Sequence, residues 1–329
     1  MEMRKLFVPA IAAAMMVGSA STASAQTVLK ASDVHPFGYP TVEAVVSLGK
    51  KLEAATNGKY KIQMFPAMQL GGEKEALEQV QLGALAMTRV SVGPVGPIVD
   101  EVNVFNLPFV FRDEEHMRKV IDGDIGTELL DKITADPKAN LIGLAWMDAG
   151  TRSVFNKVRP INKPEDLKGL KIRMMGNPLY VDTMNSLGGT GVAMGMPEVY
   201  NGIATGVVEG AENNEPSYVS FNLISVAKYY SFTQHLMIPE ILVFSKKVWN
   251  TLTPDEQALM KKLGREAQME ERVLWDKKVT EAMEKMKSTP GVEINYITDK
   301  APFQAAVKPV WDKYGAKYAK MIERINAVK

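Results

Sequence analysis

The chain has 329 residues, of which 39 are Lys or Arg, 38 are Asp or Glu, and none is Cys. A chain without cysteine has no thiol nucleophile, no cysteine-ligated iron–sulfur cluster and no thiolate zinc site. The near balance of charge provides no field that would attract nucleic acid or an anionic membrane surface. The length exceeds what one ordinary core uses and predicts two lobes.

Residues 1–25 have the features of a secretory signal peptide. Arg4 and Lys5 precede an apolar stretch over residues 6–17, and Ala23-Ser24-Ala25 matches an A-x-A cleavage site. The apolar stretch is shorter than the roughly 20 residues of a spanning helix, which argues against a membrane anchor. Cleavage after Ala25 would release the mature chain into the periplasm, and it would carry no cysteine for lipid attachment.

The first part of the mature chain alternates between strand and helix patterns. We expect strands at 28–32, at the edge of a sheet, and at 60–65, with helices at 39–54 and 73–82. This alternation favours a mainly parallel sheet covered by helices.

Two later segments predict how the chain passes between the lobes. The apolar run 141–146 predicts a buried strand, and Gly150 marks a crossing into a second α/β unit that extends to about residue 235. The apolar run 239–244 then returns the chain to the first lobe.

A long helix is predicted to begin at Thr253. Thr253 is a favourable N-cap, Pro254 fits the first helical position, and Glu256 completes a capping box. Nothing breaks the pattern before Pro290, so the helix would contain about 35 residues and extend roughly 50 Å. That length exceeds one lobe, so we expect the helix to cross both. The alternative is two helices with a bend near Gly264.

The segment that ends at Arg173 predicts an anion-binding group. Asn162 and Pro164 indicate a helix start, Gly169 indicates its end, and the apolar run 170–172 predicts a strand that ends at Arg173. Strand ends in open α/β sheets face the crevice where ligands bind. A guanidinium offers a planar fork of donors that fits a carboxylate. The alternative is a surface arginine paired with a nearby carboxylate such as Asp166.

The same segment carries a family resemblance. The chain reads R-P-I-N-K-P-E-D-L-K-G-L-K-I-R over 159–173, E-V-Y over 198–200 and G-V-V-E-G-A-E-N over 206–213. It resembles the solute-binding proteins of tripartite ATP-independent periplasmic (TRAP) transporters, and similar features recur at 66–71, 106–109 and 227–230. Departures are Glu209 where the family usually has Asp, Gly-Thr at 189–190, and Asn-Gly-Ile-Ala at 201–204.

The resemblance implies an α/β, two-lobed periplasmic solute-binding fold with a long helix spanning both lobes and a cleft between them. Lobe I would contain residues 26–150 and 239–278, and lobe II residues 151–238 and 279–329. The protein would bind an organic acid as a monomer and deliver it to the small and large membrane subunits of a symporter.

Four candidate ligand residues belong to the predicted second lobe. The resemblance makes Arg173 the clamp for a substrate carboxylate and Arg152 the second arginine of the cleft, although Arg152 could instead form an interdomain salt bridge. Asn213 matches a cleft asparagine, whose amide both donates and accepts, or else it is a turn residue. Asn177 lies just beyond Arg173 and is a further candidate.

Three candidates belong to the first lobe. His35 follows the first predicted strand and precedes a proline that extends the backbone, or it is an ordinary surface histidine. Glu73 could accept hydrogen bonds from sugar hydroxyls, although the helix dipole alone favours a carboxylate at that helix start. Arg89 lies at another predicted strand end.

No enzyme motif is evident, and we expect no cofactor and no metal. The histidines, His35, His116 and His235, have no metal-ligand spacing, and no phosphate-binding or nucleophile motif occurs. An exported enzyme with a pair of catalytic carboxylates is the open alternative. The stretches 33–36, 39–42 and 212–214 resemble the branch that binds hexuronates, meaning glucuronate and galacturonate. Other ligands left open are other sugar acids, C4-dicarboxylates and 2-oxo acids, and another role is that of a sensory receptor.

Overall fold

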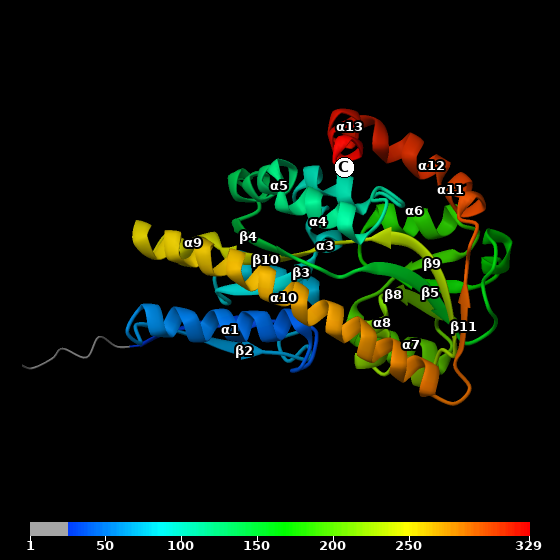
Figure 1. Cartoon of the computed structure of the whole chain (residues 1–329), viewed down its shortest axis with the longest axis horizontal. Helices are drawn as coiled ribbons and strands as arrows, with labels where there is room; N and C mark the ends of the chain where they lie inside the picture. The colour runs from blue at the N-terminus through cyan, green and yellow to red at the C-terminus, as the bar shows by residue number, and fades with distance from the viewer. Residues whose placement is uncertain (1–25) are drawn as a thin grey trace, which may run out of the picture.

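Two β-sheets lie end to end along an elongated molecule in the computed structural model, which describes residues 26–329 (Figure 1). The first sheet has the order β2-β1-β3-β10-β4, with β1 (Thr27–Ser32), β2 (Tyr60–Phe65), β3 (Met87–Ser91), β4 (Leu141–Met147) and β10 (Glu240–Ser245). The second has the order β11-β9-β5-β8-β6-β7, with β5 (Thr151–Asn156), β6 (Lys171–Met174), β7 (Thr190–Ala193), β8 (Gly210–Asn213), β9 (Tyr229–Met237) and β11 (Glu293–Tyr296). The predicted signal peptide lies outside the described residues.

Helices cover both sheets. The α-helices are α1 (Pro40–Ala55), α2 (Glu73–Leu82), α3 (Val92–Val95), α4 (Glu114–Asp122), α5 (Asp124–Ala135), α6 (Pro178–Ser186), α7 (Met196–Thr205), α8 (Glu215–Ser220), α9 (Lys246–Trp249), α10 (Pro254–Ser288), α11 (Ala301–Ala306), α12 (Lys308–Val310) and α13 (Ala319–Ala327). The 3-10 helices are η1 (Asp100–Asn106), η2 (Pro164–Leu167), η3 (Leu223–Ser225) and η5 (Ala316–Tyr318), and η4 (Trp311–Gly315) is a π-helix. The helix predicted after Asn162 is therefore only the single turn η2.

The expectation of a mainly parallel sheet is confirmed, because all the strands of each sheet but one run in the same direction; the exceptions are β10 in the first sheet and β5 in the second. Strand β1 pairs in parallel with β2 and β3, whereas β10 runs antiparallel to both β3 and β4. In the second sheet, β5 runs antiparallel to β8 and β9. Strand–helix–strand units produce parallel pairs, but β10 enters its sheet directly from β9 without such a unit. Strand β1 lies inside the first sheet, and β2 forms the edge that was predicted for β1.

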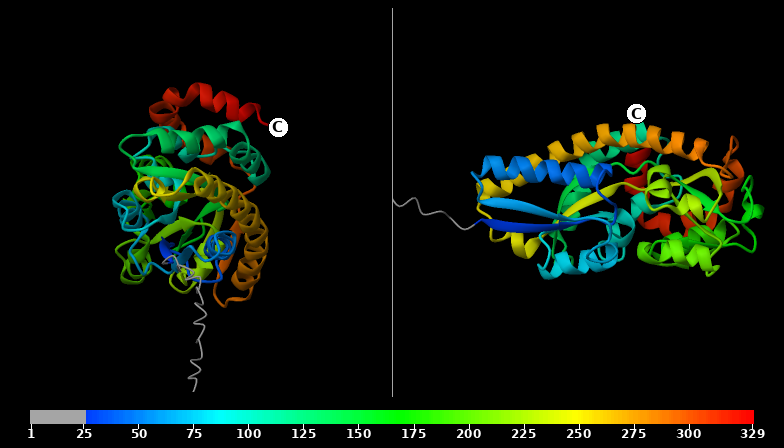
Figure 2. Two further views of the ribbon diagram at one scale, coloured as in Figure 1. Left: turned by 90° about the vertical axis from the view of Figure 1, so that its left-hand side faces the viewer. Right: turned by 90° about the horizontal axis from the view of Figure 1, so that it is seen from below.

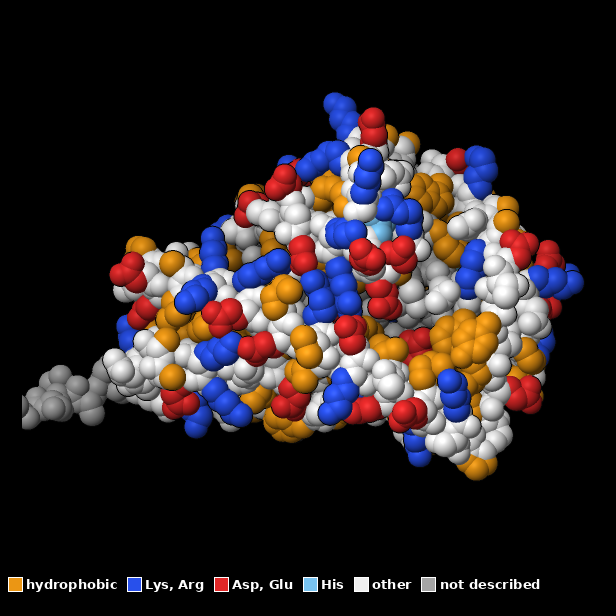
Figure 3. Space-filling view, viewed as in Figure 1, with side chains coloured by type: hydrophobic (Ala, Val, Ile, Leu, Met, Phe, Trp, Pro, Cys, Tyr) orange, Lys and Arg blue, Asp and Glu red, His pale blue; other side chains and the backbone are white. Residues whose placement is uncertain are grey.

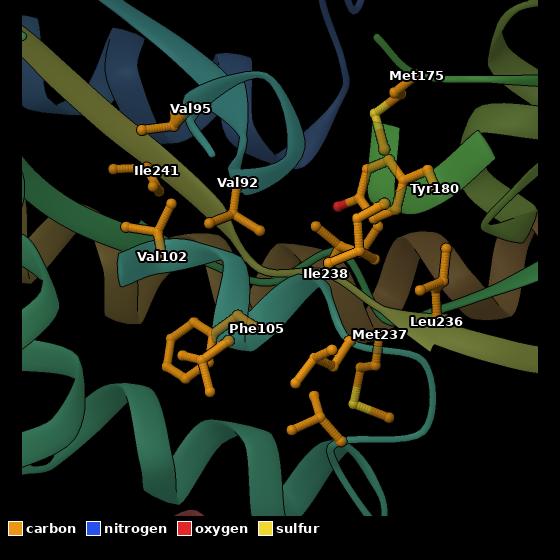
Figure 4. Close-up of a cluster of buried hydrophobic side chains, with 14 of the residues drawn as sticks. Val92, Val95, Val102, Phe105, Met175, Tyr180, Leu236, Met237, Ile238 and Ile241 are labelled. Carbon is orange, nitrogen blue, oxygen red and sulfur yellow. The ribbon is translucent and has the colours of Figure 1, made fainter. Parts of the chain in front are cut away.

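Two short segments carry the chain between the sheets. Residues 148–150 join β4 to β5, and residues 238–239 join β9 to β10. The predicted crossing at Gly150 is thus confirmed, and this glycine has a left-handed φ of 57°. Figure 4 shows the second crossing, where Ile238 lies between Tyr180 of α6 and apolar side chains that include Val92 and Phe105. Apolar packing therefore buries this crossing.

The long helix is confirmed as one continuous element of 35 residues. The side chain of Thr253 accepts a hydrogen bond from the backbone N–H of Glu256, as the capping box predicts. The alternative of two helices is wrong, because α10 continues through Gly264. A Cβ at Gly264 would lie 2.9 Å from Leu144 Cγ, so this glycine lets α10 pack closely on β4. Helix α10 also contacts α1 and α8, and Figure 2 shows it extending along both sheets.

The C-terminal helices contact elements next to both sheets. Helix α11 contacts β9 of the second sheet, whereas α13 contacts α5, and Arg324 pairs with Glu128 at 2.6 Å. The end of the chain thus lies against residues expected in lobe I, although the sequence placed it in lobe II. The exact lobe boundaries remain a prediction.

Charge is mixed on the molecular surface. Acidic and basic side chains alternate across the face in Figure 3, which agrees with the balanced composition. Between residues 26 and 329, none of the helices combines the length and the hydropathy required to cross a bilayer.

The conformation of Gly150 gives a first prediction. In Gly150→Ala, the new Cβ would occupy a left-handed backbone position and lie 3.0 Å from Trp275. We expect the free energy of unfolding to fall by about 1–2 kcal/mol in urea titrations. The control is Gly176→Ala, where no atom lies within 4 Å of the new Cβ and φ is not left-handed. An equal loss in both variants would contradict the role of the Gly150 backbone.

Candidate ligand site

A cavity lies where elements of the two sheets face each other. Its walls contain Val34, His35, Glu73, Arg89, Ser91 and Glu240 from the side of the first sheet, and Arg152, Arg173, Met175, Met196, Asn213, Ser217 and Phe221 from the side of the second. Six of the seven predicted ligand residues therefore meet in one place. The volume of this cavity is only about 20 Å³. A sugar acid could enter only if the two sides moved apart.

Arg89 is the centre of a buried ion-pair cluster. Its guanidinium contacts Asp33 (Nε to Oδ2, 3.1 Å), Glu73 (Nη1 to Oε1, 2.7 Å) and Glu240. Burial alone would lower the pKa of Arg89, but these three carboxylates outweigh it and raise the pKa. Arg89 lies within β3, not at a strand end, and is 1 % exposed. Its donors are committed to protein carboxylates, so it positions Glu73 and Glu240 instead of offering a free charge.

His35 is buried, so the alternative of a surface histidine is wrong. Its Nδ1 lies 3.0 Å from Asp33 Oδ1, and its ring stacks on Tyr39 with centroids 3.6 Å apart. Its Nε2 lies 3.2 Å from Ser217 Oγ, which belongs to α8 across the cavity. Burial and the charge of Arg89 lower the pKa of His35 to about 4. The imidazole is therefore neutral at pH 7 and links the two sides of the cavity.

Arg152 is neutralised within its own sheet. Its Nε and Nη2 reach Glu212 Oε2 at 2.6 Å and Oε1 at 2.9 Å, and its Nη1 donates to Asn213 Oδ1 at 2.8 Å. Because β5 and β8 are adjacent strands, this ion pair is not the interdomain salt bridge considered from the sequence. Asn213 is the last residue of β8 and not a turn residue, and its amide oxygen is occupied by Arg152.

Arg173 differs from the other two arginines because it has no carboxylate partner. It lies inside β6, one residue before the strand ends, and is 4 % exposed. Its Nε donates to the carbonyl of Met194 at 2.8 Å. Among residues 26–329, no carboxylate lies within ion-pair distance of its guanidinium, which also excludes the predicted alternative of a pair with Asp166. Burial lowers the pKa of Arg173 to about 10, so it remains charged at pH 7. A buried cation without an anion is costly, and a ligand carboxylate would compensate it.

Asn177 does not line the cavity. It caps α6, where its side chain accepts a hydrogen bond from the N–H of Leu179 at 3.0 Å. Its amide nitrogen donates to Gly93 O at 2.9 Å and Asn103 Oδ1 at 3.0 Å. Asn177 therefore ties α6 to the segment after β3. Proximity to Arg173 in the sequence was misleading, because the backbone turns away from the cavity into a helix.

Sequence reasoning missed several wall residues, above all Glu240, Ser217 and Phe221. Glu240 is the first residue of β10 and follows Pro239. A carboxylate at the start of an apolar run was the one feature of the sequence that could have indicated a site residue there. Burial raises the pKa of Glu240 to about 7, against the lowering effect of Arg89. Ser217 and Phe221 follow the recognised 206–213 motif by a few residues and carried no signal of their own.

Residues 31–317 match a protein family described as bacterial extracellular solute-binding protein, family 7. The chain belongs to this family. Its members are TRAP transporter receptors, so the expected family, receptor class and two-sheet fold are confirmed. Membership also confirms the expectation of a transport receptor instead of an enzyme.

Solved structures of family members resemble the chain closely. A TRAP periplasmic solute-binding protein from Pseudomonas putida F1 with bound D-glucuronate is 54 % identical, with a TM-score of 0.90 over 92 % of this chain and 98 % of that chain. A Citrobacter koseri relative with bound D-glucuronate is 49 % identical, with a TM-score of 0.90 over 92 % and 100 %. A Bradyrhizobium relative in complex with D-galacturonate is 42 % identical, with a TM-score of 0.87 over 91 % and 99 %.

A second Citrobacter koseri structure indicates which arrangement the present structure represents. It is free of ligand and open, and its TM-score to this chain is 0.79, over 91 % of this chain and 99 % of that chain at 47 % identity. The ligand-bound Citrobacter koseri structure scores 0.90. The present structure is therefore closer to the ligand-bound arrangement than to the open one, in agreement with its narrow cavity.

The neutral, buried His35 predicts a pH dependence of stability. Its pKa is lowered from 6.5 to about 4 on folding. The stability linked to neutral His35 is present above pH 6.5 and is lost as the pH falls toward 4, because the unfolded chain takes up the proton first. The shift corresponds to about 3 kcal/mol. We expect the free energy of unfolding of His35→Gln to depend less on pH between 6.5 and 4 than that of the unmodified protein. Parallel pH profiles would contradict the assignment.

Proposed function

We propose that this protein is the periplasmic receptor through which a TRAP transporter captures a hexuronate, D-glucuronate or D-galacturonate. The observation that carries the proposal is the contrast between the two walls of the cavity. One wall presents the charged Arg173 without a carboxylate partner, and the other presents the carboxylates of Glu73 and Glu240. A ligand with one carboxylate and several hydroxyls complements both. The bound ligands of the Pseudomonas, Citrobacter and Bradyrhizobium relatives support this choice.

The carboxylate of the ligand would bind to Arg173. Strand β6 fixes the base of this side chain, and the bond from Nε to Met194 O holds the guanidinium plane. The remaining N–H groups form a fork suited to two parallel hydrogen bonds. Arg152, whose charge is compensated by Glu212, would hold Asn213 in position through its bond to the amide oxygen. The amide nitrogen of Asn213 would add a donor, since its oxygen is already bound to Arg152.

The hydroxyl groups of the ligand would bind to the opposite wall. Ser91 Oγ lies 3.0 Å from Glu73 Oε1 and 3.3 Å from Glu240 Oε1, so these groups converge. Around Arg89, three carboxylates share one cation, which leaves an excess of acceptors for hydroxyl donors. A second ligand carboxylate would meet like charge there. The wall therefore favours hexuronates over C4-dicarboxylates, and over 2-oxo acids, which lack the hydroxyls.

Binding would be coupled to closure of the cleft. His35 and Tyr39 contact Ser217 across the cavity at 3.2 and 3.0 Å, and the His35 ring lies 4.9 Å from Phe221. A ligand held by both walls stabilises the closed form, because only that form makes both sets of contacts. Residues 148–150 and 238–239 would act as the hinge. The closed monomer, exported with cleavage after Ala25, would then present the ligand to the small and large membrane subunits.

A ligand panel tests the proposed substrate class. For residues 26–329, a ligand that binds only the folded protein stabilises it by about 4 kcal/mol at a thousandfold excess over Kd. We expect glucuronate or galacturonate to raise the melting temperature. Galactarate, which carries a second carboxylate, and glucose, which carries none, should not. A larger shift with galactarate or succinate than with either hexuronate would refute the charge argument.

Substitution of Arg173 tests the clamp. Arg173→Ala should weaken hexuronate binding by about a hundredfold or more in isothermal titration calorimetry, because a charged hydrogen-bonded pair is lost. Arg173→Lys should also bind poorly, since a point charge cannot form two parallel bonds. Folding should survive, because the buried guanidinium has no protein anion to lose. The control is Arg324→Ala, a half-exposed arginine on α13. Unchanged affinity in Arg173→Ala would exclude this clamp.

A further inference from the structure

A second and larger cavity adjoins the ligand site; we call it the outer chamber. Its volume is about 560 Å³, compared with about 20 Å³ for the inner cavity. One wall is formed by α2 and by the segment that contains α3, and the other by the residues that follow β6 and β7. The outer chamber is therefore built by elements from both sheets, like the inner cavity.

The two cavities are adjacent. Glu73, Arg173, Met175 and Met196 line both of them. The bond from Arg173 Nε to Met194 O places the buried guanidinium at this boundary, and Met194 itself lines the outer chamber. A ligand whose carboxylate binds Arg173 would thus have its neighbouring atoms at the entrance to the outer chamber.

The lining of the outer chamber is suited to an apolar group. Three prolyl and aliphatic side chains lie on the wall beside α3, and three methionines lie on the opposite wall; they are Pro94, Pro97, Ile98, Met175, Met194 and Met196. Methionine side chains are unbranched and adapt to irregular apolar surfaces. Such walls accept an aromatic or aliphatic group of variable shape.

The charges of the outer chamber disfavour an anion. Apart from Glu73 and Arg173, which line both cavities, Glu75, Glu78 and Glu198 line the outer chamber, against the single ammonium of Lys74. Lys74 lies 4.0 Å from Glu78 and so neutralises only one of them. A second uronate residue, as in an oligogalacturonide, would be repelled by the remaining carboxylates.

We propose that the outer chamber is a second subsite, which takes an uncharged, partly apolar group carried by a hexuronate in O-glycosidic linkage. The inner cavity holds the uronate head, and the substituent passes between Met175 and Met196 into the outer chamber. The inference rests on the proposed hexuronate site and extends its substrate class from the free sugar acid to its neutral conjugates.

Calorimetry with matched ligands tests the subsite. The probes for residues 26–329 are glucuronate, 4-nitrophenyl β-D-glucuronide, its 4-carboxyphenyl counterpart, and 4-nitrophenyl β-D-glucoside. We expect glucuronate and the nitrophenyl glucuronide to bind. The carboxyphenyl glucuronide should bind more weakly because its tail is anionic, and the glucoside should not bind because it lacks the carboxylate.

A variant that fills the outer chamber tests whether the aryl group of the ligand binds there. Gly176 lines the outer chamber but not the inner cavity, and a Cβ there would have no atom within 4 Å. Gly176→Phe should lower the affinity for the nitrophenyl glucuronide by about tenfold or more, since it occupies the space of the aryl group. Its affinity for glucuronate should stay within about twofold, which also verifies folding. Gly176→Ala is the matched control and should change neither affinity.

The outcomes separate this inference from the proposed function. Binding of glucuronate without binding of the nitrophenyl conjugate would overturn the subsite and leave the hexuronate receptor intact. Binding of both, with neither affected by Gly176→Phe, would also overturn it, because the tail would then lie elsewhere. Failure of all the uronates to bind would overturn the proposed function itself.

Discussion

Three guanidinium groups are buried where the two sheets face each other, and each must be compensated by negative charge or remain costly. Arg89 is surrounded by three carboxylates, and Arg152 is paired with Glu212. Only Arg173 has no anion among the described residues. Under the proposed function, a ligand carboxylate would supply the negative charge that Arg173 lacks.

The connections between the sheets determine how this arrangement can respond to a ligand. Each crossing is short, and the second is packed in apolar side chains around Ile238. Helix α10 contacts α1 and strand β4 of the first sheet at one part of its length, and α8 next to the second sheet at another. In the proposed closure, the two walls would therefore change the angle between them without being rebuilt. Arg89 and Arg152 would keep their partners, because each ion-pair network involves residues from one side only.

Local patterns in the sequence predicted the positions of helices and strands well. They could not predict which strands pair with each other or which distant residues meet. The capping residues at Thr253 and Glu256 defined the start of α10, and the strand at 60–65 and helix at 73–82 were predicted with their observed bounds. The antiparallel placement of β10 depends on which strands it meets, which no local pattern encodes. Likewise, the cluster around Arg89 draws on Glu240, 151 residues further along the chain. Arg173 was recognisable because its whole segment carried the family pattern.

The contacts of Ser217 have a consequence for how occupancy is reported. Ser217 contacts His35 and Tyr39 directly, so contacts within the protein itself contribute to the free energy of the proposed closure. The measured affinity of such a receptor is the product of its intrinsic affinity and the fraction of molecules already shut. A substitution at Ser217 would therefore change the sensitivity of uptake without altering Arg173. The same contacts would also bear on fidelity, because an empty receptor that closes too readily would compete with loaded molecules for the membrane subunits.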